Sequence, residues 1–145
     1  MSNEKLAEIF EKVSDSIEGE PGRWQFYVKD ISLMCFTDLG NNRMRIISPI
    51  METFQLSEEL KNACLTANFH TALDVKYAIS NDILWTVYIH PLKELSEEQL
   101  IDAISQVYAS NITFGTSFSS STLIFPGLSS EDSKEKKKTT KKERF

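Results

Sequence analysis

Residues 72–91, with the sequence ALDVKYAISNDILWTVYIHP, constrain the fold of this chain more than any other segment. Apolar and polar side chains alternate up to Ser80, whereas the run from Ile83 to Ile89 is apolar on both faces. The Asn81-Asp82 pair between them is typical of a tight hairpin turn. The segment therefore predicts two paired strands. The second strand should lie more centrally in the sheet, or turn its outer face towards another subunit.

Before this hairpin, spacing and turn residues predict two helices and three strands. Apolar residues at helical spacing predict a helix over about 3–18, which Gly19 and the Pro21-Gly22 pair should end. Three strands follow over 24–29, 31–38 and 43–50. Pro49 should end the third strand because it lacks the N–H that a central ladder uses. Ser57 is then a suitable N-cap for a second helix that stops near residues 68–70.

After the hairpin, Ser96 and Gln99 form the capping-box pattern that begins a helix. Its apolar spacing extends to Ser110 and, more weakly, to Phe118. The order helix, three strands, helix, two strands, helix predicts an α+β fold, an antiparallel sheet with helices on one side. We expect a single domain over residues 1–128, because a chain of 145 residues with 41% hydrophobic content can bury one core.

Residues 129–145 differ in composition from the rest of the chain. They hold seven Lys or Arg against four Asp or Glu, so the net charge of −5 divides into about −8 for residues 1–128 and +3 for this segment. We expect a disordered Lys-rich tail, either solubilising or able to contact nucleic acid or acidic lipids. The acidic body disfavours nucleic-acid binding by the folded domain. The apolar runs are too short to span a membrane and the N-terminus is charged, which predicts a cytoplasmic protein.

The second half of the chain resembles the YbjN family and the type III secretion chaperones. The resemblance rests on Asn68, on the hairpin residues, on Pro91 and on the helix entry Leu95-Ser96-Glu97-Glu98-Gln99-Leu100, and its element order covers about residues 3–118. The hairpin residues concerned are Leu73, Val75, Tyr77, Ile79, Ile83, Trp85 and Val87. The resemblance implies a small, usually dimeric protein that binds other proteins. It implies no catalytic residues in this chain.

The chemistry-bearing residues of the chain do not form a known catalytic or metal-binding motif. Cys35 and Cys64 lie within apolar patterns and are predicted to be buried free thiols rather than nucleophiles. His70, His90 and Asp74 flank the strands at a spacing that matches no metal motif. We therefore predict a protein that is not an enzyme and has no cofactor and no metal. The alternative is a small-molecule sensor or unrecognised enzyme with a pocket near the second hairpin.

The runs Ile31 to Phe36 and Ile83 to Ile89 carry more apolar residues than strands with one solvated face need. These side chains belong either to the core or to a surface that binds another protein or an apolar ligand. Covering that surface by homodimerisation, through the sheet or the second helix, would explain the excess. The predicted interaction surface consists of Trp24, Phe36, Trp85, Val87 and Tyr88.

Overall fold

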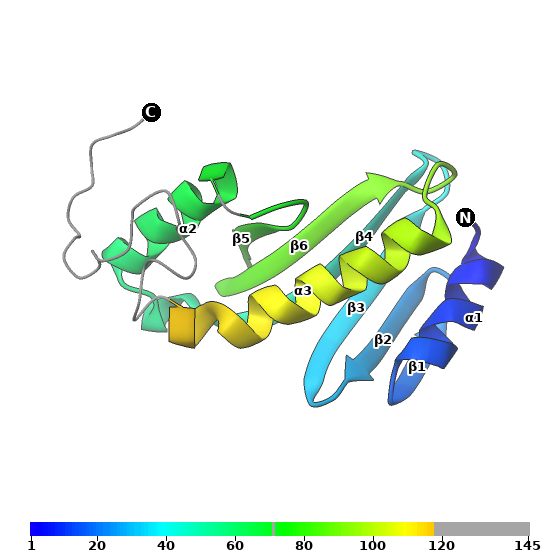
Figure 1. The fold of residues 1–145 in the computed structure, drawn as a ribbon, viewed down its shortest axis with the longest axis horizontal. Helices are drawn as coiled ribbons and strands as arrows, with labels where there is room; N and C mark the ends of the chain where they lie inside the picture. The colour runs from blue at the N-terminus through cyan, green and yellow to red at the C-terminus, as the bar shows by residue number, and fades with distance from the viewer. Residues whose placement is uncertain (71, 118–145) are drawn as a thin grey trace.

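The computed structural model describes residues 1–70 and 72–117 (Figure 1). These residues form a six-stranded antiparallel sheet with three α-helices, which confirms the predicted α+β class. The elements are α1 (Asn3–Val13), β1 (Ser16–Glu20), β2 (Arg23–Val28), β3 (Ile31–Asp38), β4 (Arg43–Glu52), the 3-10 turn η1 (Thr53–Gln55), α2 (Glu58–His70), β5 (Lys76–Ser80), β6 (Ile83–Pro91) and α3 (Glu97–Ser117).

The strand order in the sheet is β1-β2-β3-β4-β6-β5, and every neighbouring pair is antiparallel. Figure 1 shows α1 and α3 lying over the same face of the sheet, with α1 over β1 and β2 and with α2 beside the β5 end. The prediction that helices gather on one side is therefore confirmed for α1 and α3. As predicted, β6 lies inside the sheet, between β4 and β5.

The first helix is shorter than predicted, because α1 ends at Val13 and the next residues form the edge strand β1. Ser14 takes an extended backbone, and both its N–H and its hydroxyl donate to the carbonyl of Phe10, at 3.1 and 2.6 Å. Ile17 then pairs with Phe26 in a β1–β2 hairpin. Its helical spacing from Val13 also fits a strand residue that faces the same core. The predicted order is corrected to helix, four strands, helix, two strands, helix.

The strand through Pro49 does not stop there as predicted but continues to Glu52. The ladder of β3 with β4 ends at Met34↔Ile47, so Pro49 lies beyond its last pair. A missing N–H at this position costs no hydrogen bond of that ladder. On the other side of β4, the register with β6 shifts between Pro49 and Met51, which marks a β-bulge at this point.

The second hairpin confirms the predicted turn but shortens its first strand. Asn81 and Asp82 both have positive φ, 53° and 62°, as a two-residue type I′ turn requires. Strand β5 covers only Lys76–Ser80, and Leu73, predicted to lie in the strand, is 74% exposed. Asn68 pairs with the outer edge of β5, since its side chain donates to the carbonyl of Tyr77 at 3.0 Å and accepts from its N–H at 2.8 Å.

The core lies between the sheet and the two helices that cover it. The Phe10 ring stacks on Phe26 at 4.4 Å, and both side chains are fully buried. The predicted capping box of α3 is confirmed: Gln99 N–H donates to the Ser96 hydroxyl at 3.0 Å, and Ser96 N–H donates to the Gln99 side chain at 2.9 Å. The helix then runs through Ser110 to Ser117.

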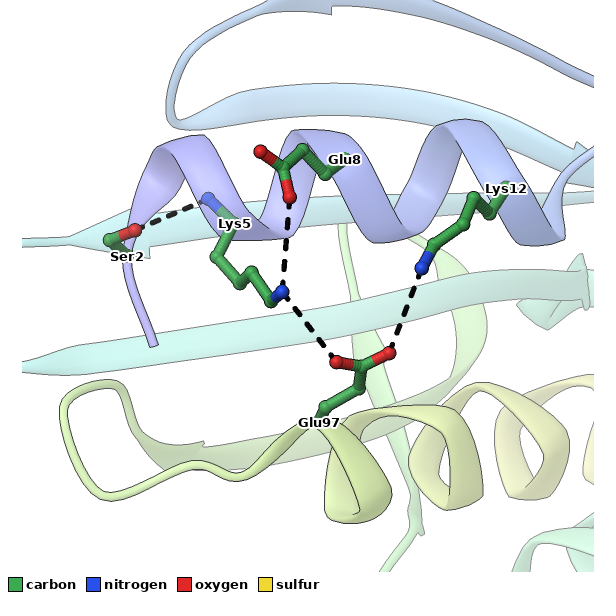
Figure 2. Close-up of polar contacts among 5 residues, drawn as sticks. All are labelled: Ser2, Lys5, Glu8, Lys12 and Glu97. Carbon is green, nitrogen blue, oxygen red and sulfur yellow. Dashed lines mark hydrogen bonds and ion pairs between the residues drawn. The ribbon is translucent and has the colours of Figure 1, made fainter.

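Exposed ion pairs link the two helices at the N-terminal end of α3 (Figure 2). The carboxylate of Glu97 lies 3.7 Å from Lys5 and 3.9 Å from Lys12, both on α1. Lys5 also lies 3.8 Å from Glu8. The predicted tail over 129–145, and the end of the predicted domain over 118–128, lie outside the described residues.

Candidate protein-binding surface

Alternation along the strands divides the predicted interaction residues between the two faces of the sheet. Trp24 and Tyr88 lie on the face that α1 and α3 cover, where they are 6% and 5% exposed and belong to the main core. Trp24 packs edge-on against Phe10, with ring centroids 5.5 Å apart. These two residues are therefore a correction to the predicted surface: their register turns them towards the face that the helices cover.

Phe36, Trp85 and Val87 lie on the opposite face, over which Figure 1 shows no helix. Strand pairing brings them together with their neighbours: Met34 lies opposite Ile47, and Ile47 lies opposite Val87. Phe36 lies opposite Arg45, which in turn pairs with Ile89. We call this surface the open face, and its apolar residues are Met34, Phe36, Ile47, Trp85, Val87 and Ile89.

The apolar residues of the open face are half-buried, except for Ile89, which is 53% exposed. The indole N–H of Trp85 donates to the carbonyl of Ser80 at 3.0 Å, so the ring is held in place with its polar atom satisfied. The Arg23 guanidinium lies 5.9 Å from the centroid of the Phe36 ring, a cation–π geometry at the border of the open face.

A second group of exposed apolar side chains follows α2, where the sequence prediction named no site. Leu65 and Phe69, four residues apart on the helix, are 67% and 75% exposed, and Leu73 beyond the helix is 74% exposed. Of the side chains of α2, only Cys64 and Ala67 are buried. The pattern Leu65, Phe69, Leu73 could have been recognised in the sequence as a second apolar row.

The thiols and imidazoles are placed poorly for catalysis. Burial raises the pKa of the Cys64 thiol to about 12 and that of Cys35 still further, so both stay protonated near neutral pH. His90 Nδ1 lies 2.8 Å from the carbonyl of Pro91, and its ring stacks on Tyr88 at 5.9 Å. His70 lies at the end of α2, edge-on to Phe69. Within residues 1–70 and 72–117, no three His, Cys, Asp or Glu side chains form a metal-binding group.

An open pocket of about 360 Å³ lies beside the second hairpin, where the alternative prediction placed one. It contains Asp74 and His90 of the three candidate residues, whereas His70 does not line it. Gln106 of α3 bridges the two aspartates of the pocket: its side-chain amide donates to Asp74 at 3.0 Å and to Asp102 at 2.8 Å. The lining residues are Leu73, Asp74, Lys76, Tyr88, Ile89, His90, Gln99 and Asp102.

Solved structures share this fold at low sequence identity. A chain of the complex of the Yersinia pestis type III secretion chaperone SycH with a fragment of YscM2 aligns with a TM-score of 0.58 and 16% identity, over 78% of this chain and 99% of that one. A chain of the HopA1–SchA chaperone–effector complex aligns with a TM-score of 0.55 and 11% identity, over 75% and 95%. A chain of the ExsC–ExsE complex aligns with a TM-score of 0.60 and 11% identity, over 75% of this chain and 86% of that one.

An uncharacterised protein from Methanothermobacter thermautotrophicus has a similar fold, with a TM-score of 0.57 and 13% identity, over 79% of this chain and 94% of the other. No model of a known protein family matches the chain, and no curated protein matches its sequence. The fold is therefore that of the type III secretion chaperones, as the resemblance implied. In the part of the chain that the structure describes, no helix is long and apolar enough to cross a membrane.

Proposed function

We propose that this chain is a non-enzymatic, chaperone-like or regulatory module that binds other proteins, and that it acts as a homodimer in the cytoplasm. The open face is the observation that carries the proposal. A contiguous apolar strip across β3, β4 and β6, which no helix within residues 1–70 and 72–117 covers, is typical of an interface rather than of a solvated sheet face.

The comparisons support the protein-binding part of this proposal. Two of the similar structures are complexes of a chaperone with a protein, SycH with YscM2 and SchA with HopA1. The homodimer rests on the open face itself. Two copies packed through this face would bury the apolar strip of both in one isologous interface. Membership of the YbjN family and the domain boundary at residue 128 remain predictions.

Affinity capture with matched variants tests the binding function. Val87→Asp places a charge in the middle of the open face, and Leu39→Asp makes the same change at a 65% exposed position in the β3–β4 turn. We expect the full-length wild type and Leu39→Asp to retain the same stoichiometric protein partner from the native cells, and Val87→Asp to lose it. Because the homodimer is proposed to be the form that binds the partner, loss of its interface should remove the partner, and equal retention by all three would refute a role of the open face in binding.

A small-molecule sensor is the second candidate, because the pocket beside the hairpin holds Asp74 and His90. In a thermal-shift screen against metabolites and metal ions, a ligand of this pocket would raise the melting temperature of the wild type. It would not raise that of a variant with both Asp74→Ala and His90→Ala. A ligand that stabilises both equally would not be bound in this pocket.

A further inference from the structure

The outer edge of β6 loses its neighbouring strand at the pocket. The pairing of β5 with β6 ends at Lys76↔Val87, whereas β6 continues to Pro91. In the β5–β6 hairpin, Ile83, Trp85 and Val87 direct their main-chain groups towards β5, and alternation directs those of Ile89 the same way. Among the described residues, no main-chain hydrogen bond joins Ile89 to the 72–75 segment, so its N–H and C=O face the pocket side without a partner strand.

The chain blocks the neighbouring edge but leaves this one open. At β5, the side chain of Asn68 forms hydrogen bonds with both the N–H and the C=O of Tyr77. At Ile89 no comparable side chain is present within the described residues, and the N–H of Asp74, which an extension of the β5 register would place opposite Ile89, donates to Gln106 at 3.0 Å instead. An unpaired edge of this kind can receive an extended segment as an added strand.

The pocket beside this edge carries two carboxylates that lack a cationic partner. Within the part of the chain that the structure describes, no Lys or Arg nitrogen lies within 4.0 Å of Asp74 or Asp102. Their hydrogen bonds from Gln106 use one oxygen of each carboxylate. Lys76 also lines the pocket, but its ammonium group donates to the carbonyls of Ala72 and Leu73, at 3.3 and 3.0 Å.

Tyr88 supplies an independent indication that this pocket binds a ligand. It is 95% buried and lines the pocket, and no hydrogen bond in the described residues uses its hydroxyl group. Because Tyr88 lines an open pocket, a hydroxyl that the described residues leave unpaired is accessible to a ligand. Burial raises the pKa of Tyr88, and the negative charges of Asp74 and Asp102 raise it further, which places the hydroxyl within electrostatic reach of both carboxylates.

We propose that this pocket receives the lysine or arginine side chain of an extended segment of a partner protein, laid beside Ile89 at the open edge of β6. The cationic group would pair with Asp74 and Asp102, whose free oxygens accept hydrogen bonds, and with the oxygen of the Tyr88 hydroxyl. The segment's backbone would pair with the N–H and C=O of Ile89. This inference rests on the proposed protein-binding function and adds to it the chemistry of one partner residue.

Two capped heptapeptides test the inference, each alternating threonine and valine about a central residue. One carries arginine at the centre and the other carries citrulline, which is nearly isosteric but neutral. Both are titrated into the ¹⁵N-labelled full-length chain while the Ile89 amide and the Gln106 side-chain amide are followed by NMR. We expect both signals to shift with the arginine peptide, and its Kd to be about fivefold lower than that of the citrulline peptide.

Conservative variants assign the effect to the two carboxylates. Asp74→Asn with Asp102→Asn keeps an acceptor for Gln106 and should weaken arginine-peptide binding to the citrulline level, whereas Asp30→Asn in the β2–β3 turn, which does not line the pocket, should not. Equal affinity for the two peptides, or binding that the double variant does not weaken, would overturn the proposal. So would tighter binding when Lys136, Lys137 and Lys138 are changed to glutamine, because the chain's own tail would then be the occupant.

The outcomes separate this inference from the proposed function. If the chain binds the arginine and citrulline peptides equally while Val87→Asp still abolishes partner capture, the proposed role of the pocket is refuted and that of the open face is supported. If the arginine peptide binds as expected and no variant of the open face affects capture of the protein partner, the proposed role of the open face is refuted and that of the pocket is supported.

Discussion

The side chain of Asn111 on α3 donates a hydrogen bond of 2.7 Å to the hydroxyl of Ser48 in the middle of β4. Asn111 also donates to the carbonyl of Pro49 at 2.9 Å, and Ser48 in turn donates to the carbonyl of Ser32 on β3 at 2.7 Å. Ser48 is fully buried. This chain of hydrogen bonds fixes α3 against the bulged part of β4 and leaves little freedom for the helix to slide along the sheet.

Asn111→Ala should therefore lower the free energy of unfolding by about 2 kcal/mol, because it removes the donor to the part-buried carbonyl of Pro49 and to the hydroxyl of the fully buried Ser48. Ser105→Ala, at an exposed position on the same helix, should change it by less than about 0.5 kcal/mol. Urea unfolding followed by circular dichroism measures both values. Equal stability of the two variants would show that the network contributes nothing.

Phe10→Ala should lower the free energy of unfolding by about 3–5 kcal/mol, because it removes a fully buried ring that stacks on Phe26 and holds α1 to β2. Phe54→Ala is the matched control, since Phe54 is 80% exposed and should contribute almost nothing to the stability of the chain. Thermal and urea unfolding compare the two. A Phe10→Ala variant as stable as Phe54→Ala would mean that α1 does not pack as the structure shows.

The ion pairs in Figure 2 should contribute little in spite of their number. Glu97 lies 3.7 and 3.9 Å from two lysines, but its side chain is 46% exposed and those of Lys5 and Lys12 are 48% and 67% exposed. Glu97→Gln should lower the free energy of unfolding by no more than about 1 kcal/mol, and the difference should shrink in 1 M NaCl. A larger, salt-independent loss would contradict this account.

Cys64 should make the stability fall at alkaline pH. Its thiol pKa is raised by burial from 9.0 to about 12, so the folded state keeps a proton that the unfolded state releases above pH 9. The stabilisation is fully present below pH 9 and is lost as the pH rises from 9 towards 12. Cys64→Ala should flatten this part of the stability curve, measured by urea unfolding between pH 8 and 11. An unchanged slope would assign the loss to other groups, such as Tyr77, whose pKa burial also raises.

Both thiols should resist alkylation in the folded chain at pH 8, since the reactive thiolate is nearly absent. Iodoacetamide should modify Cys35 and Cys64 only after denaturation, as mass spectrometry of the intact chain would show. Rapid labelling of either residue in native buffer would contradict the burial described above.

The sequence predicted those elements whose signals are local. The Ser96–Gln99 capping box and the Asn81-Asp82 turn are each defined by a few neighbouring residues, and both are confirmed. Strand β1 was missed because Ile17 fits a helix and a strand equally well from spacing alone. It lies in a strand because Ser14 caps the preceding helix and Phe26 offers a pairing partner.

The interaction surface could be predicted only in part. Phe36, Trp85 and Val87 lie on the open face, whereas Trp24 and Tyr88 face the helices. Strands β3 and β6 carry large apolar side chains on both faces, so alternation there does not reveal which set is covered. That choice depends on register and on where the helices pack, which only the folded sheet determines.

The molar mass of the full-length chain in solution tests the central claim most directly, because the open face is proposed to pack against a second copy. Light scattering should give twice the 16.6 kDa of one chain for the wild type and for Leu39→Asp. It should give 16.6 kDa for Val87→Asp and for Ile89→Asp, with helix and strand content unchanged in the circular dichroism spectrum. A monomeric wild type, or a dimer that both open-face variants leave intact, would contradict the account.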